Sequence, residues 1–295
     1  MIYFVQCVLG GILLGLLYAV IALGLTIVWR SGRILNLAQG ELVIVGGFLI
    51  WWFIAMTPLP QWWLGIIIAF GIMALLGLAI ERGIFRPLIG QPVFTLVMMT
   101  IGLLILLRGL VIVIFGGEER PFPQIFPIEH VVLGPFSFDS ALFWGGIIAL
   151  LIVVALAWFF ERTRYGRRFS AVAEDHIVAQ SMGISVKQAV SVAWVLAAML
   201  GGFASIVFLN AKTLTFIASE IGFRGLPVAL LAGLESVRGA PLAGLIVGIG
   251  ESLARAYIDP ITGGGMAEVF PYIVMVIVVL FRPQGLYGWK IIERG

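Results

Sequence analysis

Two uninterrupted apolar stretches decide the fold of this chain: IIALLIVVALAWFF at Ile147–Phe160 and YIVMVIVVLF at Tyr272–Phe281. Neither alternates apolar with polar residues, as the strands of a membrane β-barrel would. Backbone groups in lipid must be hydrogen-bonded within their own segment, so long apolar runs predict helices.

The rest of the chain has the same character. Its 295 residues are 61% hydrophobic and 11% charged, and their mean hydropathy is +1.13. A soluble domain has about 25% charged residues, so a chain this apolar requires lipid as its solvent. The predicted fold is all-α: a single polytopic membrane domain over residues 1–295, one or more of whose roughly eight or nine transmembrane helices is discontinuous.

The apolar runs predict the positions of the membrane spans, since each crossing needs about 20 apolar residues. The predicted spans are 4–29, 34–56, 62–80, 93–116, 142–160, 189–209, 224–236, 241–257 and 268–282. The 224–236 segment is too short to cross a bilayer fully, and a half-helix there would leave eight crossings instead of nine.

The basic residues predict the orientation. If the N-terminus is outside, the inner segments are 30–33, 81–91, 161–188, 237–240 and 282–295. These segments hold 13 of the 18 Lys and Arg residues, whereas the outer loops hold three. Cytoplasmic loops are enriched in Lys and Arg. We therefore expect the C-terminus and the loop 161–188 in the cytoplasm, and the loop 117–141 in the periplasm.

The composition also argues against several kinds of site. One cysteine, Cys7, and two histidines, His130 and His176, are too few for a disulfide framework or a His/Cys metal cluster. The chain has no Gly-x-x-x-x-Gly-Lys-[Ser/Thr] phosphate-binding loop. We therefore expect no metal and no cofactor in this chain. The net charge of +3 is attributed to the cytoplasmic loops, and no nucleic-acid partner is expected.

Polar residues cluster at the start of the second predicted span, in Asn36–Glu41. A helix broken at Gly40 would expose backbone groups, and such breaks are tolerated only where they line a cavity. The alternative is an interfacial helix start with Asn36 as its N-cap. Charges in a bilayer are costly and mark functional sites by default.

Three further features are singled out inside the membrane. Glu251 and Arg255 have the four-residue spacing of a helical ion pair, and Arg108 needs a carbonyl or carboxylate partner. A sharp reversal is predicted at Gly233–Pro241, with Glu235 inside it. The glycines Gly11, Gly15, Gly244 and Gly248 have GxxxG spacing, which favours close helix packing within one bundle or, alternatively, a dimer seam. The candidate pathway residues are Asn36, Gln39, Gly40, Glu41, Glu235 and Glu251.

The loop 161–188 begins with a basic stretch and continues with Ala171–Ile184, interpreted as a short amphipathic helix that ends at Gly183. Its predicted contact face is Ala171, Ile177, Val178 and Met182. Such a face suits insertion into a groove on a partner protein. A helix on the membrane surface, anchored to anionic lipid by its arginines, is the alternative.

Four motifs in order resemble the permease subunit of ABC importers of the branched-chain amino acid (LivH-like) type, over nearly the whole chain. They are Asn-x-Ala-x-Gly-Glu at 36–41, Thr-x-Tyr-Gly-Arg at 163–167 with the loop after it, Leu-x-Gly-Leu-x-Ser-x-x-Gly-Ala at 231–240, and Arg-Pro-Gln-Gly-Leu-Tyr-Gly at 282–288.

The resemblance implies an importer of the bacterial inner membrane. Its other parts would be a second permease subunit (a paralogue or a second copy), two ATPase subunits that hold ATP and Mg²⁺, and a periplasmic solute-binding protein. The loop would be the coupling helix. By matching position, the residues in contact with the ATPase would be Arg167, Ala173, Glu174, Asp175, Ala179, Met182, Gly183 and Ile184.

The solute and the driving force have alternatives. Gln39 stands where many family members have histidine, and related permeases carry urea, short amides, aromatic acids or dicarboxylic acids. A secondary transporter driven by an ion gradient would use Glu41, Glu251 and broken helices. An enzyme is not expected, because no nucleophile–base pair with an orienting third group is evident.

Overall fold

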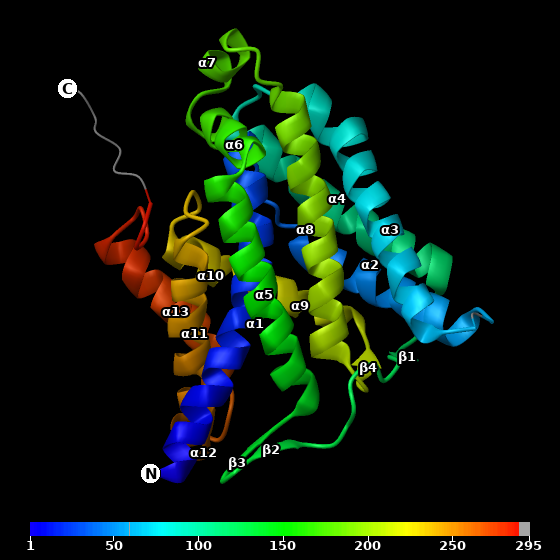
Figure 1. Cartoon of the computed structure of the whole chain (residues 1–295), viewed down its shortest axis with the longest axis vertical. Coiled ribbons are helices and arrows are strands. Elements are labelled where there is room, and N and C mark those ends of the chain that lie inside the picture. Colours follow the sequence, from blue (N-terminus) through cyan, green and yellow to red (C-terminus); the bar gives the residue numbers. More distant parts are fainter. Residues whose placement is uncertain (59, 289–295) are drawn as a thin grey trace.

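A computed structural model gives the fold, and it describes residues 1–58 and 60–288. Its long helices run between two ends of the molecule. One end carries the N-terminus of α1, and the other carries the short helices α6 and α7 (Figure 1). Seven helices among the described residues are long and apolar enough to cross a membrane.

Most long helices match the predicted spans. They are α1 (Ile2–Gly32), α2 (Gln39–Trp51) with a π-helical turn (Trp52–Met56), α3 (Trp62–Ile80) with π-helical (Glu81–Phe85) and 3-10 (Arg86–Leu88) turns, α4 (Val93–Phe115), α5 (Ser140–Arg162), α8 (Val186–Leu209), and α11 (Gly239–Leu253) with a π-helical turn (Ala254–Ile258) and α12 (Asp259–Thr262). The shorter apolar helix α13 (Met266–Phe281) contains Pro271.

The remaining elements are short. They are α6 (Arg164–Glu174), α7 (His176–Ser181), a 3-10 turn (Phe216–Ala218), α9 (Ser219–Phe223), α10 (Gly225–Ala232), and the strands β1 (Arg120–Pro121), β2 (Val131–Leu133), β3 (Phe136–Phe138) and β4 (Thr213–Leu214). Antiparallel pairing joins β1 to β4 and β2 to β3. The strands stabilise the loops at the end that carries the N-terminus.

One predicted span needs correction. The second begins at Gln39 and not at residue 34, because α1 ends at Arg33 in a left-handed conformation (φ 56°) and residues 34–38 are not helical. The half-helix alternative for 224–236 is confirmed, since the helix there is the eight residues of α10. A helix of that length is about 12 Å long, which is less than half of a bilayer core of about 30 Å. Of the predicted inner tail 282–295, residues 289–295 lie outside the described part of the chain.

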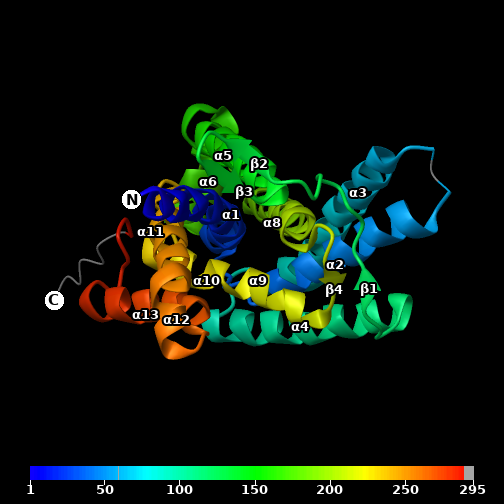
Figure 2. The ribbon, with the colours of Figure 1, turned by 90° about the horizontal axis from the view of Figure 1, so that it is seen from below.

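Among the described membrane spans, α1 has the most buried membrane window. A seam of glycines brings it against α11. A β-carbon on Gly11 would lie 2.6 Å from the Cα of Ile249, and one on Gly15 would lie 2.5 Å from the carbonyl oxygen of Gly244. The backbones of α1 and α11 are therefore in direct contact. The GxxxG spacing serves packing within one bundle, as predicted first, and Figure 2 shows the two helices crossing.

Two of the sequence motifs pack against each other. The segment after α13 returns to the end of α10, where Leu286 N–H donates to the Leu231 carbonyl at 2.8 Å and Tyr287 N–H to the Ala232 carbonyl at 3.1 Å. Gly233 and Gly285 meet there with φ of 85° and 74°. A side chain at either position would be strained and would also collide with the other backbone.

Candidate functional site

The discontinuous segment that follows α8 is the centre of the candidate site. After Leu209 the chain passes through β4 and a 3-10 turn into α9 and α10. Figure 2 shows α9 and α10 inside the bundle, between α1 and α2 on one side and α4 and α13 on the other. An irregular backbone at this position is tolerated where it is buried in protein or lines a cavity. Two buried carboxylates, one on each flank, hold the segment.

On the first flank, Glu41 in the first turn of α2 is paired with Arg108 of α4. Arg108 Nη2 lies 2.5 Å from Glu41 Oε1 and donates to the Ser219 hydroxyl of α9 at 3.0 Å. The Glu41 side chain is 1% exposed, and its Oε2 has no partner among the described residues. Glu41 is therefore the carboxylate partner that Arg108 was predicted to need and that could not be identified from the sequence.

Gly40 has a different role from the predicted one. It lies inside the first turn of α2, and its Cα packs directly against Ser219 and Gly222 of α9. The helical structure is interrupted at Arg33–Ala38 instead. Gly40 therefore permits close packing of α2 on α9, and it does not interrupt the helix.

The second flank is organised by Glu251 of α11, whose side chain is fully buried. Its Oε2 accepts a hydrogen bond from the Tyr18 hydroxyl at 2.8 Å, and its Oε1 lies 3.2 Å from Arg224 Nη1 and 2.8 Å from Arg255 Nη2. The predicted Glu251–Arg255 pair is confirmed. Arg224, directly before α10, and Tyr18 of α1 are additions that the sequence did not reveal, because their contacts depend on how distant helices pack.

Asn36, in the connection before α2, and Gln39, the first residue of α2, are both buried. Asn36 Nδ2 donates to Gln39 Oε1 at 3.0 Å, and Gln39 Nε2 donates to the Ala197 carbonyl of α8 at 3.1 Å. Asn36 is not the N-cap of α2, since Ala38 holds that position and no side chain caps it. A cavity of about 10 Å³ beside both residues has room for about one water molecule.

Glu235 lies away from the other pathway candidates. It is in the turn between α10 and α11 and forms an ion pair with Arg33 at the end of α1. Arg33 Nη2 also donates to the Ala173 carbonyl of α6 at 3.2 Å. Arg33 therefore joins three elements: α1, α6 and the turn that follows α10. Four of the pathway candidates therefore lie together around the start of α2: Asn36, Gln39, Gly40 and Glu41. The other two, Glu251 and Glu235, lie apart from this group.

The predicted amphipathic helix of the loop 161–188 is divided into two helices. The basic stretch forms α6, and Asp175 interrupts the helix with an extended backbone (φ −152°) and then caps α7. Asp175 Oδ1 accepts from the backbone N–H groups of Val178 and Ile177, and these two hydrogen bonds lower the pKa of its carboxyl. Gly183 follows α7 with φ 75°, so the helix ends where predicted.

The exposed tip of α7 consists of three large apolar residues. Ile177 is 80% exposed, Val178 54% and Met182 71%. Four further predicted contact residues are also exposed, and Ile184 is half-buried; the four are Arg167, Glu174, Asp175 and Gly183. Ala173 and Ala179, in contrast, are buried against the rest of the chain. The alanines therefore seat the helices on the bundle, and the face available to a partner is the apolar tip.

In the described ranges, no group of three His, Cys, Asp or Glu side chains lies close enough to hold a metal ion. The chemistry of the site therefore consists of arginine–carboxylate pairs inside the membrane. The two buried glutamates and their arginines fix α9 and α10 to the helices on either side.

Comparison with known proteins gives the family. The family described as the permease component of branched-chain amino acid transport systems matches residues 7–279. The permease LivH of Escherichia coli K12, described as part of a high-affinity branched-chain amino acid transport system, is 28% identical, covering 99% of this chain and 98% of LivH. The corresponding permease BraD of Pseudomonas aeruginosa has the same identity and coverage. A probable LivH of Methanocaldococcus jannaschii is 27% identical, over 97% of this chain and 93% of its own. This chain therefore belongs to the family of branched-chain amino acid transport system permease components.

Proposed function

We propose that this chain is a permease subunit of an ATP-driven ABC importer that carries branched-chain amino acids or related small polar solutes into the cytoplasm. The family match over residues 7–279 is the observation that carries the proposal. The chain would be a multi-pass protein of a bacterial inner membrane, and a transport subunit instead of an enzyme. ATP and Mg²⁺ would bind to two separate ATPase subunits.

The pathway would lie between two permease subunits, next to α9 and α10. Binding cavities for small molecules are about 300–1,000 Å³, whereas the cavity beside Asn36 is about 10 Å³. A second subunit, either a paralogue or another copy of this chain, would supply the opposite wall. A periplasmic binding protein would deliver solute to the end that carries the N-terminus.

The tip of α7 would be the contact with the ATPase. Exposed apolar side chains at the end of a polar loop suit insertion into a groove on a partner. Arg33 would transmit movement of α6 to the turn at Glu235 and from there to α10. An ATPase-driven displacement of α6 and α7 would in this way reach the discontinuous segment of the pathway.

The test is a reconstituted importer carrying Ile177→Asp. A charge on the α7 tip would not fit an apolar groove, so we expect at least a tenfold loss of ATP-dependent leucine uptake in proteoliposomes and weaker co-purification of the ATPase subunits. Ile128→Asp is the matched control, because Ile128 is 65% exposed in the loop between α4 and α5. Its co-purification of the ATPase subunits is expected to remain within twofold of the wild type.

Two outcomes would overturn the proposal. Normal uptake by the Ile177→Asp variant would exclude the coupling role of α7. Uptake that persists without any ATPase subunit would favour the secondary transporter instead. That alternative has less support, because Glu41 and Glu251 are both paired with arginines that compensate their charges.

A further inference from the structure

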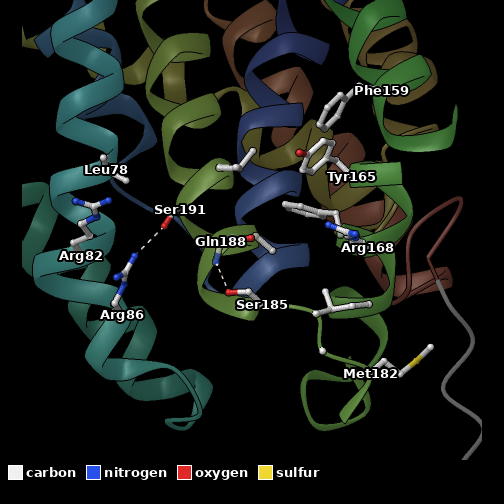
Figure 3. Close-up of a pocket in the computed structure, with 15 residues that line it drawn as sticks. Leu78, Arg82, Arg86, Phe159, Tyr165, Arg168, Met182, Ser185, Gln188 and Ser191 are labelled. Atoms are coloured by element: carbon white, nitrogen blue, oxygen red, sulfur yellow. Dashed lines mark hydrogen bonds between the residues drawn. The ribbon is translucent and has the colours of Figure 1, made fainter. Parts of the chain in front are cut away.

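A groove of about 600 Å³ lies at the α6–α7 end of the molecule, apart from the discontinuous segment. One wall is the end of α3 and the turns after it, and the other is α6 with the end of α5. The start of α8 forms the floor. Figure 3 shows Arg82 and Arg86 on one wall and Arg168, beside Tyr165, on the other.

The groove has an uncompensated positive charge. Arg86 forms a 3.0 Å ion pair with the buried Glu81, which also accepts from the Ser191 hydroxyl at 2.8 Å. Within residues 1–58 and 60–288, neither Arg82 nor Arg168 forms an ion pair. None of the lining residues is acidic. The guanidinium groups give both walls a positive charge, and either one could bind a phosphate with two parallel hydrogen bonds.

Part of the groove lining is apolar. Leu78 of α3, Phe159 of α5 and Val192 of α8 line it. Val192 is 43% exposed, although most of the membrane segment of α8 is buried. Figure 1 shows α8 between α5 and α3, and these two flanking helices expose large apolar side chains such as Leu151 and Leu75. The apolar residues of the groove therefore lie on helices whose other faces expose large apolar side chains.

We propose that this groove is a binding site for one anionic phospholipid of the cytoplasmic leaflet. Its phosphate would lie between Arg82 and Arg168, and an acyl chain would lie over Val192 between α3 and α5. Basic pockets at the cytoplasmic side of membrane helices recognise anionic head groups in this way. A protein partner fits less well, because the apolar lining residues belong to membrane-spanning helices. The groove is also lined by Met182, Gly183 and Ile184, which are among the residues expected to contact the ATPase, so the experiment must separate the two roles.

The experiment is native mass spectrometry of the purified full chain after exchange into equal amounts of phosphatidylglycerol and phosphatidylcholine. We expect the wild type to retain one phosphatidylglycerol with at least a tenfold preference. The double variant Arg82→Gln/Arg168→Gln should lose that preference. The matched control Arg162→Gln/Arg164→Gln removes the same charge from the same end of the molecule, outside the groove, and should change the preference by less than twofold.

A further variant tests the acyl-chain part of the site. Val192→Trp would fill the floor while keeping both arginines, and we expect it to reduce lipid retention at least fivefold. If the two double-arginine variants, in the groove and outside it, lose equal amounts of the preference for phosphatidylglycerol, the proposal is overturned. Such a result would indicate a general attraction of anionic lipid to positive charge. Displacement of the lipid by millimolar inorganic phosphate would overturn it in favour of a free-phosphate site. Complete displacement by added ATPase subunits would reassign the groove to a protein interface.

Discussion

Glu41 and Arg108 illustrate at the residue scale how this membrane protein accommodates charge. They are 67 positions apart in sequence, and Arg108 also binds the Ser219 hydroxyl. Intramembrane charge alone predicts that each needs a partner. The identity of the partner depends on the packing of α2, α4 and α9, which no local pattern in the sequence encodes. Arg224 and Tyr18 escaped prediction for the same reason.

This pair leads to a prediction about stability. Arg108→Gln would leave Glu41 buried and uncompensated, and loss of one partner of a buried pair typically costs about 3–5 kcal/mol. We expect a cost near 3 kcal/mol, because the Arg108 side chain is 40% exposed. Adding Glu41→Gln should recover at least half of the loss. The measurement is thermal unfolding in detergent of both single variants and the double variant.

The matched control is Arg120→Gln. Arg120 pairs with Glu118, whose side chain is 79% exposed. Exposed ion pairs contribute about 0–1 kcal/mol, so a small shift in Tm is expected. If Arg108→Gln unfolds at the same temperature as Arg120→Gln, Glu41 is not held by Arg108 in the way described.

At the scale of elements, the apolar runs predicted the helices well and their interruptions poorly. The start of α2 is five residues later than predicted, because the left-handed Arg33 and the polar hydrogen bonds of Asn36 and Gln39 shape the connection. The loop helix is divided at Asp175, whose side chain caps α7. Caps and turns involve only one or two residues, so hydrophobic periodicity does not reveal them.

The glycine seam between α1 and α11 leads to a second prediction. Gly248→Ala would force these helices apart, because the added methyl would collide with the backbone of Gly15. Overpacking of this kind costs about 1–3 kcal/mol. Gly10→Ala is the control: its added methyl has no atom within 4 Å. Alanine favours a helix over glycine by up to about 1 kcal/mol.

Thermal unfolding in the same detergent measures both substitutions. We expect a lower Tm for Gly248→Ala and an unchanged or slightly higher Tm for Gly10→Ala. Similar values for the two variants would mean that α1 and α11 are not in backbone contact. A shift in oligomeric state caused by Gly248→Ala alone would restore the dimer-seam interpretation of the same glycines.

At the scale of the whole molecule, the basic residues predict an orientation, and the structure places the relevant segments at opposite ends. Figure 1 shows α7 at one end and the β2–β3 hairpin at the other. With α7 in the cytoplasm, Ile177→Cys should react with a membrane-impermeant maleimide only in inside-out vesicles. Ile128→Cys should react only in intact spheroplasts. The background is Cys7→Ser, which removes the chain's single natural cysteine.

The reverse labelling pattern would invert the orientation and place α6 and α7 outside, away from any ATPase. The sequence predicts orientation from many residues together, so one misplaced charge does not change it. Pairings such as Arg33 with Glu235 are different, because each depends on a single contact between distant segments. The motif at 231–240 contains Glu235, but nothing in the sequence indicated that Arg33 would meet it.

The central position of α1 has a consequence for biogenesis. Helix α1 is synthesised before the helices that enclose it, and 83% of its membrane window is buried in the folded chain. When α1 enters the bilayer, its glycine face has only lipid to contact, and its partner α11 begins more than 200 residues later, at Gly239. Assembly must therefore end with lipid expelled from the first helix by the later ones. A chain interrupted before α11 is expected to leave that seam open, and it would be a natural target for membrane quality-control proteases.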